Sequence, residues 1–248
     1  MTPSLTTRMK ALYVRESFRP GLIAMFIDPF YIARRGLFES IADLSHHVGG
    51  RVLDVGCGQK PYEALFQTTE YVGLELDTVE NRQKKKADFF YEGRVFPFEN
   101  ASFDTVILNQ VLEHVFNPDE FLGEINRVLK QGGGLLLTTP FMWDEHEQPH
   151  DFARYSSFGL RHLLETHGFR VVEHRKSVAD VRVIFQMINC YIHKSVNLWN
   201  PYLKLIAWVL LTSPFNFLGT VIYRMLPPNK DLFLDNVVFA RTKTGDSG

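Results

Sequence analysis

The chain has 248 residues, of which 45% are hydrophobic and 22% are charged, a composition typical of one sizeable folded domain. Its 27 basic and 28 acidic residues leave a formal net charge of −1, so no overall field attracts nucleic acid, and no zinc-finger spacing or RNA-binding signature is present. Two cysteines are too few for a disulfide framework, and the amino-terminal segment lacks the apolar core of a signal peptide. These features predict a cytoplasmic protein that binds no nucleic acid.

Strand and helix patterns alternate along the chain after an amino-terminal helical region. Residues 1–48 carry an amphipathic helical pattern that Gly49 and Gly50 end. Strands are expected at 51–55, 71–75, 87–90, 103–109, 134–140, 169–175 and 232–241, and helices at 62–67, 118–130 and 157–167. Short buried strands that alternate with helices indicate a mostly parallel sheet covered on both faces.

A long apolar segment precedes the last expected strand. Residues 198–226 are nearly all apolar, but Lys204, Pro214 and Asn216 divide them into pieces shorter than the roughly 20 residues that span a bilayer. The connection is too long for an ordinary loop, so we expect helices. A helix that is apolar on all sides is buried or meets lipid. The alternatives are a helical cap, a homodimer surface and a peripheral membrane contact through residues 196–226, for which nearby basic residues are suited.

An acid and two glycines follow the first expected strand. Gly56 and Gly58 let the chain turn sharply and let a ligand lie against the backbone. In an open parallel sheet, ligands bind outside the carboxyl ends of the strands. Glu75 ends the second expected strand, 21 residues after Asp54, where a carboxylate accepts hydrogen bonds from ribose hydroxyls in nucleotide-binding folds. A tight turn that binds no ligand is the alternative.

Two classes of nucleotide ligand compete for this turn. A dinucleotide site requires a third glycine for close helix packing, but Pro61 stands at that position, which argues against a dinucleotide or nucleotide-sugar oxidoreductase. A nucleoside that carries an amino acid needs a turn, an acid for its ammonium group and an acid for its ribose. S-adenosylmethionine is such a ligand, and Asp54 fits its ammonium end.

Four segments together resemble the motifs of class I S-adenosylmethionine-dependent methyltransferases, most closely the methyltransferase type 11 group. They are VLDVGCGQKPY, YVGLELD, FPFENASFDTVILNQVLEHV and INRVLKQGGGLLLTTP. The resemblance implies a Rossmann-like α/β fold, a doubly wound and mostly parallel sheet of seven strands whose last strand is antiparallel. The resemblance covers about residues 48–178 and the last strand. Together with the helical patterns, it leads us to expect one methyltransferase domain over residues 1–248, with a helical cap at 1–48, a cofactor-binding core at 49–178, an apolar helical insertion at 179–230 and the last strand at 231–243.

The same resemblance assigns roles to individual residues. The implied cofactor-binding residues are Asp54, Gly56 and Gly58 for the methionine portion, Glu75 for the ribose, Asp88 and Phe89 beside the adenine, and Asn109 and Gln110 at the methyl-transfer site. A strand cap is the alternative role for Asp88, and a place in the core is the alternative for Phe89. Many relatives have a third glycine where this chain has Lys60, whose role stays open.

Three histidines are candidates for a general base, since methyl transfer to a hydroxyl benefits from one. They are His114, after the fourth strand, and His146 and His150, after the fifth. The chain here also resembles ubiquinone-type O-methyltransferases, some of which hold a metal with Glu-x-x-Glu-His. Because Gln110 replaces the first acid of that motif, we predict no metal. A His114 bonded only to backbone is the alternative.

The loop after the fifth strand is rich in polar residues, which suggests contact with the acceptor. The alternative is a salt bridge between Asp151 and Arg154 that only fixes the loop. Together, these patterns predict an enzyme that transfers a methyl group from S-adenosylmethionine to a small or lipid-linked acceptor, more readily at oxygen. The rival hypothesis is a non-catalytic S-adenosylmethionine-binding or scaffold module. The sequence does not specify the acceptor.

Overall fold

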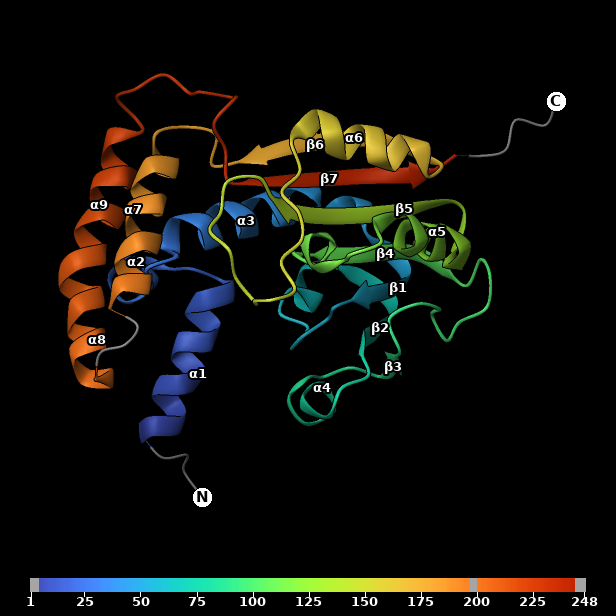
Figure 1. Cartoon of the computed structure of the whole chain (residues 1–248), viewed down its shortest axis with the longest axis horizontal. Coiled ribbons are helices and arrows are strands. Elements are labelled where there is room, and N and C mark those ends of the chain that lie inside the picture. The colour runs from blue at the N-terminus through green and yellow to red at the C-terminus, as the bar shows by residue number, and fades with distance from the viewer. Residues whose placement is uncertain (1–4, 197–199, 244–248) are drawn as a thin grey trace. The chain divides into compact units, whose positions relative to one another are not determined.

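Seven strands form one sheet in the order β3-β2-β1-β4-β5-β7-β6 (Figure 1). The pairs β1–β2, β2–β3, β1–β4 and β4–β5 are parallel, and β7 runs antiparallel to β5. The strands are β1 (Gly49–Val55), β2 (Gln67–Leu76), β3 (Phe89–Tyr91), β4 (Phe103–Asn109), β5 (Leu129–Pro140), β6 (Phe169–Ser177) and β7 (Asp235–Thr242). The fold class predicted from the sequence is therefore confirmed.

The computed structural model describes residues 5–196 and 200–243, which divide into two units. The sheet unit comprises residues 41–141, 145–175 and 235–243, and the helical unit comprises residues 5–40, 142–144, 176–196 and 200–234. The ends of the predicted domain, 1–4 and 244–248, and residues 197–199 of the apolar segment lie outside the described residues.

The structure has helices in the amino-terminal region, near 118–130 and 157–167 and in the insertion, as predicted, and one at 79–84 that was not predicted. The helices are α1 (Leu5–Phe18), α2 (Leu22–Ile27), α3 (Tyr31–Leu44), α4 (Val79–Lys84), α5 (Pro118–Val128), α6 (Ser157–Thr166), α7 (Arg182–Ser195), α8 (Pro201–Ala207) and α9 (Ser213–Ile222). The helix expected at 62–67 is wrong, since only a single 3-10 turn forms there, Glu63–Leu65. The reason is that β2 already begins at Gln67, which leaves no length for a helix.

One face of the sheet is covered by α5 and α6 (Figure 1). Alternate residues of β4 and β5, such as Leu108 and Leu137, pack against Leu122 of α5 and Leu160 of α6 in one buried cluster. Local signals place both helices. Proline and two acids occupy the first turn of α5, and the Ser156 hydroxyl accepts a hydrogen bond from the third residue of α6.

The helical unit contains most of the apolar segment. A π-helical turn, Trp208–Thr212, joins α8 to α9, just before Pro214 in the first turn of α9. Proline has no N–H for the regular helical bond, which accounts for the widened turn. Within the described residues, no helix is long and apolar enough to cross a membrane.

Buried amide side chains hold the helical unit together. Asn216 of α9 is fully buried, and its Nδ2 donates hydrogen bonds to the carbonyls of Met25 and Asp28, at 3.0 and 2.9 Å. Gln186 of α7 likewise bonds the carbonyl of Pro29 and the amide of Ala33. These carbonyls and amides belong to the ends of α2 and α3, where backbone groups lack helical partners. The polar residue that interrupts the apolar pattern thus has a structural role.

Candidate functional site

The turn after β1 contains two glycines in the left-handed region. Gly56 has a φ of +71° and Gly58 a φ of +54°, which L-residues rarely adopt. A Cβ at Gly56 would lie 2.5 Å from Cγ2 of Val111, whereas a Cβ at Gly58 would meet no atom within 4 Å. Packing therefore requires Gly56, and the backbone at Gly58 borders open space in which a ligand can lie against it.

Asp54 is buried at the carboxyl end of β1. Its Oδ2 accepts a 2.7 Å hydrogen bond from the hydroxyl of Tyr71. Burial disfavours the charged form and raises the pKa of Asp54 to about 7, although the bond from Tyr71 opposes this shift. A positively charged group beside it would stabilise the carboxylate. Asp54 thus fits the ammonium end of an amino acid.

Glu75 lies near the end of the neighbouring strand. The strand register pairs Val55 with Leu74, so Glu75 stands one residue beyond the end of β1. Its Oε1 accepts a 2.7 Å hydrogen bond from the amide of Gly58. The structure therefore brings this carboxylate directly beside the turn, at the edge of the sheet where a nucleoside ribose is expected.

Lys60 has a role that the sequence left open. Its φ is +54°, in the region that favours glycine. Its ammonium nitrogen lies 2.5 Å from Oδ2 of Asp88, which also accepts a 2.7 Å bond from the amide of Gly73. Partial burial acts in the opposite direction, but these two partners lower the pKa of Asp88. Asp88 thus ties the turn to two strands, and its contact with adenine stays a prediction. Phe89 is half exposed and packs edge-on against Phe98.

Asn109 and Gln110 lie at the end of β4. Oδ1 of Asn109 accepts a 2.8 Å hydrogen bond from the hydroxyl of Thr138 on β5, and the side chain of Gln110 donates to Oδ1 of Asp235 on β7 at 3.3 Å. Gln110 has a φ of +55°, a conformation that non-glycine residues seldom hold and that clusters at functional sites. Their place at the methyl-transfer site stays a prediction.

His114 follows β4 in a 3-10 turn, Leu112–His114. Its Nδ1 lies 2.7 Å from the backbone carbonyl oxygen of His150, so Nδ1 carries the hydrogen and Nε2 keeps its lone pair when the ring is neutral. Nε2 lies 4.0 Å from Oε1 of Glu113 and 3.9 Å from Oε2 of Glu147, beyond hydrogen-bond distance. His114 therefore has the tautomer that a general base requires.

Glu113 is a candidate that the sequence reading did not select. Its side chain is fully buried, and burial raises its pKa to about 8. Oε2 accepts a 3.2 Å hydrogen bond from the hydroxyl of Thr139, but Oε1 has no hydrogen-bond partner in the described part of the chain. A buried acid with an unpaired oxygen at the ligand-binding edge of the sheet indicates a functional position. Its adjacency to His114 was the only signal in the sequence.

The loop after β5 places the other two histidines differently. The ring of His146 meets that of His114 edge-on, with centroids 4.8 Å apart, whereas the side chain of His150 is exposed and only its carbonyl orients His114.

The same loop contains an ion pair, in which Arg154 binds both oxygens of Asp151 at 2.6 and 2.7 Å. This pair lowers the pKa of Asp151 to about 2, so the salt bridge considered from the sequence does form.

Two groups of side chains in the described residues have the composition of a metal site. In each group the candidate ligand atoms lie within 4.8 Å of one another. The first is Glu113, His114 and His146, and the second is His46, His47 and Glu173. The motif considered from the sequence includes Glu113 and His114, but each group is completed by a residue from a distant segment, His146 or Glu173, which the sequence did not indicate. The predicted absence of a metal stays a prediction.

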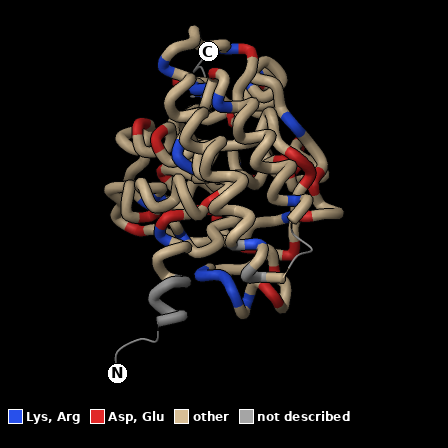
Figure 2. The backbone as a smooth tube through the Cα atoms, turned by 90° about the vertical axis from the view of Figure 1, so that its left-hand side faces the viewer, with Lys and Arg blue, Asp and Glu red and all other residues tan. Residues whose placement is uncertain are grey.

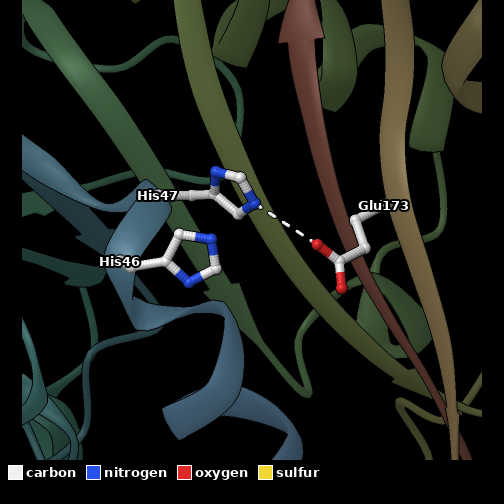
Figure 3. A group of neighbouring side chains, drawn as sticks. All are labelled: His46, His47 and Glu173. Carbon is white, nitrogen blue, oxygen red and sulfur yellow. Dashed lines mark hydrogen bonds and ion pairs between the residues drawn. The ribbon is translucent and has the colours of Figure 1, made fainter.

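The second group is drawn in Figure 3, which shows the two imidazoles side by side and Nε2 of His47 directed at Glu173. That nitrogen lies 3.4 Å from Oε2 of Glu173. The other oxygen of Glu173 is bound by Arg175 at 2.6 Å, and Nδ1 of His46 bonds the carbonyl of Asp43. These partners hold the group together as it stands, and a cation would have to compete with Arg175.

Comparison with known proteins identifies the family. The model of the methyltransferase domain family matches residues 30–174, more than half of the chain. The chain belongs to this family. It is an S-adenosylmethionine-dependent methyltransferase, and S-adenosylmethionine is its cofactor. Asp54, Gly58 and Glu75 fit that cofactor, since they combine a buried acid, open space beside a glycine and a second acid at one turn.

Curated relatives share up to about a third of their residues with this methyltransferase over the matched segments. An O-methyltransferase of Aspergillus nomiae is 30% identical over 59% of this chain and 76% of its own length. A probable S-adenosylmethionine-dependent methyltransferase of Mycolicibacterium smegmatis is 32% identical over 52% of this chain and 55% of its own. A fatty-acid O-methyltransferase of the same species is 35% identical over 41% of each chain. The methyltransferase thus matches only about half the length of some relatives.

A solved structure of the same fold is the cyclase SpnF, with a TM-score of 0.55 and 20% identity over 87% of this chain and 83% of that chain. Another is an N-methyltransferase of Haemonchus contortus in complex with phosphomonomethylethanolamine and S-adenosylhomocysteine. Its TM-score is 0.52, with 16% identity over 93% of this chain and 59% of that chain. At these identities the likeness concerns the fold alone.

Proposed function

We propose that this methyltransferase acts on an oxygen atom of a small or lipid-linked acceptor. The observation that carries the proposal is the state of His114, whose Nδ1 is bonded to a carbonyl and whose Nε2 keeps a lone pair. An imidazole in this tautomer can accept the proton of a hydroxyl. The relatives named as O-methyltransferases, including one named for fatty acids, support an oxygen acceptor.

The turn after β1 would hold the cofactor. Asp54 would bind its ammonium group, the backbone at Gly56 and Gly58 its methionine portion, and Glu75 its ribose. Asp88 and Phe89 would lie beside the adenine, and Asn109 and Gln110 at the reacting methyl. When bound, S-adenosylmethionine supplies an electrophilic methyl group. Alignment of donor and acceptor and exclusion of water supply much of the rate in such a displacement.

The three histidines would contribute in different ways. Nε2 of His114 takes the proton of a hydroxyl acceptor, and the carbonyl of His150 stabilises the resulting imidazolium through Nδ1–H. His146, whose ring contacts that of His114, is the second candidate base. His150 would act through its backbone. At neutral pH the buried Glu113 is mostly protonated, so it adds no negative charge that would hold the proton on the base.

Two kinds of oxygen acceptor distinguish base catalysis from proximity. A carboxylate acceptor, such as a fatty acid, is already deprotonated at neutral pH, whereas an alcohol or phenol must lose a proton. We expect His114→Gln to lower turnover of hydroxyl acceptors about 100-fold and to change turnover of carboxylates little. His150→Gln is the matched control and should leave both rates intact, because only its backbone is used.

The experiment uses labelled S-adenosylmethionine and a panel of fatty acids, alcohols, phenols and amines, with products identified by mass spectrometry. Methyl esters or ethers are the expected products. Methylation confined to amines would contradict the proposal. If Ala variants of His114, His146 and His150 all retain wild-type rates on hydroxyl acceptors, proximity alone drives the reaction.

We also infer a cytoplasmic protein that makes peripheral membrane contact through residues 196–226. Both cysteines are unpaired, which suits a reducing compartment. Several large apolar side chains of this segment are exposed, among them Leu210 and Phe217. Large exposed apolar patches mark interaction sites. Vesicle flotation of the wild type and of Leu210→Ser/Phe217→Ser tests this contact. A homodimer, detected by sedimentation equilibrium, is the competing outcome.

A further inference from the structure

A cavity of about 250 Å³ in the helical unit is lined by residues of α2, α3, α7 and the carboxyl-terminal end of α9. Three guanidinium groups line it, those of Arg35, Arg182 and Arg224, against a single carboxylate, that of Glu39. Three of its lining side chains, those of Met25, Tyr31 and Ile32, are buried and largely apolar. The cavity therefore combines an apolar interior with an excess of positive charge.

The three arginines differ in their partners. Arg35 bonds Glu39 at 2.8 Å, and Arg182 donates to both oxygens of Asp180, at 2.9 and 2.7 Å. Arg182 also lies over the ring of Tyr223, 4.0 Å from its centroid, and Arg224 lies over the same ring at 5.6 Å. Among the described residues, Arg224 forms no ion pair. Two cations thus share one aromatic ring, and one of them has no counter-ion, which suits an anionic ligand.

The side chains around the cavity are apolar and exposed. Leu22, at its edge, is 75% exposed. Exposed apolar side chains continue from there along α2 and α9, which pack against each other: Ile23, Phe26, Phe217, Leu218, Val221 and Met225. Helices α8 and α9 carry one charged residue between them, Lys204, so most of their backbone is tan in Figure 2. A ligand that complements both the positively charged cavity and the apolar surface of α2 and α9 has an anionic group and apolar chains.

We propose that this cavity binds the phosphate head group of an anionic membrane lipid, with the apolar side chains of α2 and α9 entering the outer acyl layer. The planar guanidinium fork matches phosphate oxygens, and such amphipathic surfaces bind anionic lipid by burial together with charge. The inference rests on the membrane contact proposed above. It adds a head-group site built largely from residues outside 196–226.

The test is co-sedimentation with vesicles of phosphatidylcholine alone or with phosphatidylglycerol. The full chain should bind only the vesicles that contain phosphatidylglycerol. Arg224→Gln should weaken that binding at least five-fold, and Arg224→Lys less, because it keeps the charge. The matched control is Arg170→Gln, which removes an equal charge from an exposed position of the sheet unit and should have no effect.

Three results would overturn the proposal. The first is no sedimentation of the intact protein with either vesicle. The second is an equal loss in Arg170→Gln, which indicates non-specific attraction. The third is displacement from vesicles by millimolar inorganic phosphate, which indicates a site for the free anion. Because lipid binding is measured without cofactor or acceptor, its failure leaves the methyl-transfer assay unaffected. Melting curves of each variant show whether the fold is intact.

Discussion

Both units bury acids and amides, but the buried acids differ in their partners. The sheet unit buries acids, Asp54 and Glu113, whose pKa values burial raises to about 7 and about 8. Among the described residues neither of these acids has an ion pair with Lys or Arg, whereas the buried Asp28 of the helical unit is paired with Arg34 at 2.7 Å. The buried amides of the helical unit, Gln186 and Asn216, are hydrogen bonded to backbone groups. A buried acid costs stability, whereas a satisfied amide contributes to it. We therefore propose that buried acids without a cationic partner belong to the chemistry of this methyltransferase, whereas paired acids and hydrogen-bonded amides belong to its architecture.

The largest effect is expected from Asp54→Asn. The neutral amide keeps an oxygen for the hydroxyl of Tyr71 but loses the charge that pairs with the cofactor ammonium, so affinity should fall at least about 100-fold. Calorimetry with S-adenosylmethionine measures this. Asp77→Asn is the matched control, an exposed acid paired with Arg82, and should bind normally. Unchanged affinity in Asp54→Asn would show that this buried acid is not part of the site.

The same variant should be more stable at neutral pH. The folded-state pKa of Asp54 is raised above its unfolded value of 3.8, so the folded protein retains the proton between about pH 4 and 7. Stability from this group is therefore lost as pH rises through that window. Replacing the acid by Asn should raise the free energy of unfolding at pH 8 by at most about 4 kcal/mol. Thermal unfolding at pH 5 and pH 8 checks this, and a variant that is less stable at pH 8 would contradict it.

Asn216→Leu tests the other half of the comparison. It leaves the carbonyls of Met25 and Asp28 without their donor, which should lower the free energy of unfolding by about 2–4 kcal/mol. The folded variant should bind the cofactor as the wild type does, because the side-chain amide of Asn216 has a structural role only. Denaturant titration and calorimetry measure the two quantities. A loss of cofactor affinity at unchanged stability would reverse our assignment of this residue.

Cofactor affinity should depend on pH through Asp54. Below about pH 7 the carboxyl of the free protein is protonated and must lose its proton for the cation to bind. The affinity for the cofactor should therefore fall nearly tenfold for each pH unit well below pH 7, and it should be nearly constant just above pH 7. In Asp54→Asn the residual binding should show no such slope. A slope that persists in the variant would assign the titration to another group.

The smallest effect is expected at Lys60, where backbone strain and an ion pair oppose each other. Lys60→Gly relieves the positive φ but removes the contact with Asp88, which is half exposed, so stability should change by no more than about 1 kcal/mol. Lys60→Ala loses the ion pair and keeps the strain, so it should be less stable than Lys60→Gly by about 1 kcal/mol. Equal stability of the two variants would show that the strain is negligible.

Much of the site could be predicted because its residues are local in sequence. Asp54, Gly56 and Gly58 belong to one strand and its turn, and Glu75 ends the next strand, so the strand pattern alone places them together. The contact between Lys60 and Asp88 was not predicted, because it depends on how a loop returns to the sheet. The short helix expected at 62–67 failed because apolar periodicity does not show where the following strand begins.

The alternation of strands and helices and the acid-and-glycine turn after the first strand could be read from the sequence alone. Such features follow from the spacing of neighbouring residues. The folded structure was needed to show the order of the strands, the burial of Glu113, the hydrogen bond at Nδ1 of His114, and the cavity lined by arginines of α3, α7 and the turn after α9. The burial of a side chain, the protonation of a ring nitrogen and the meeting of several arginines at one cavity all depend on atoms from distant parts of the chain. A local sequence pattern contains no information about those atoms.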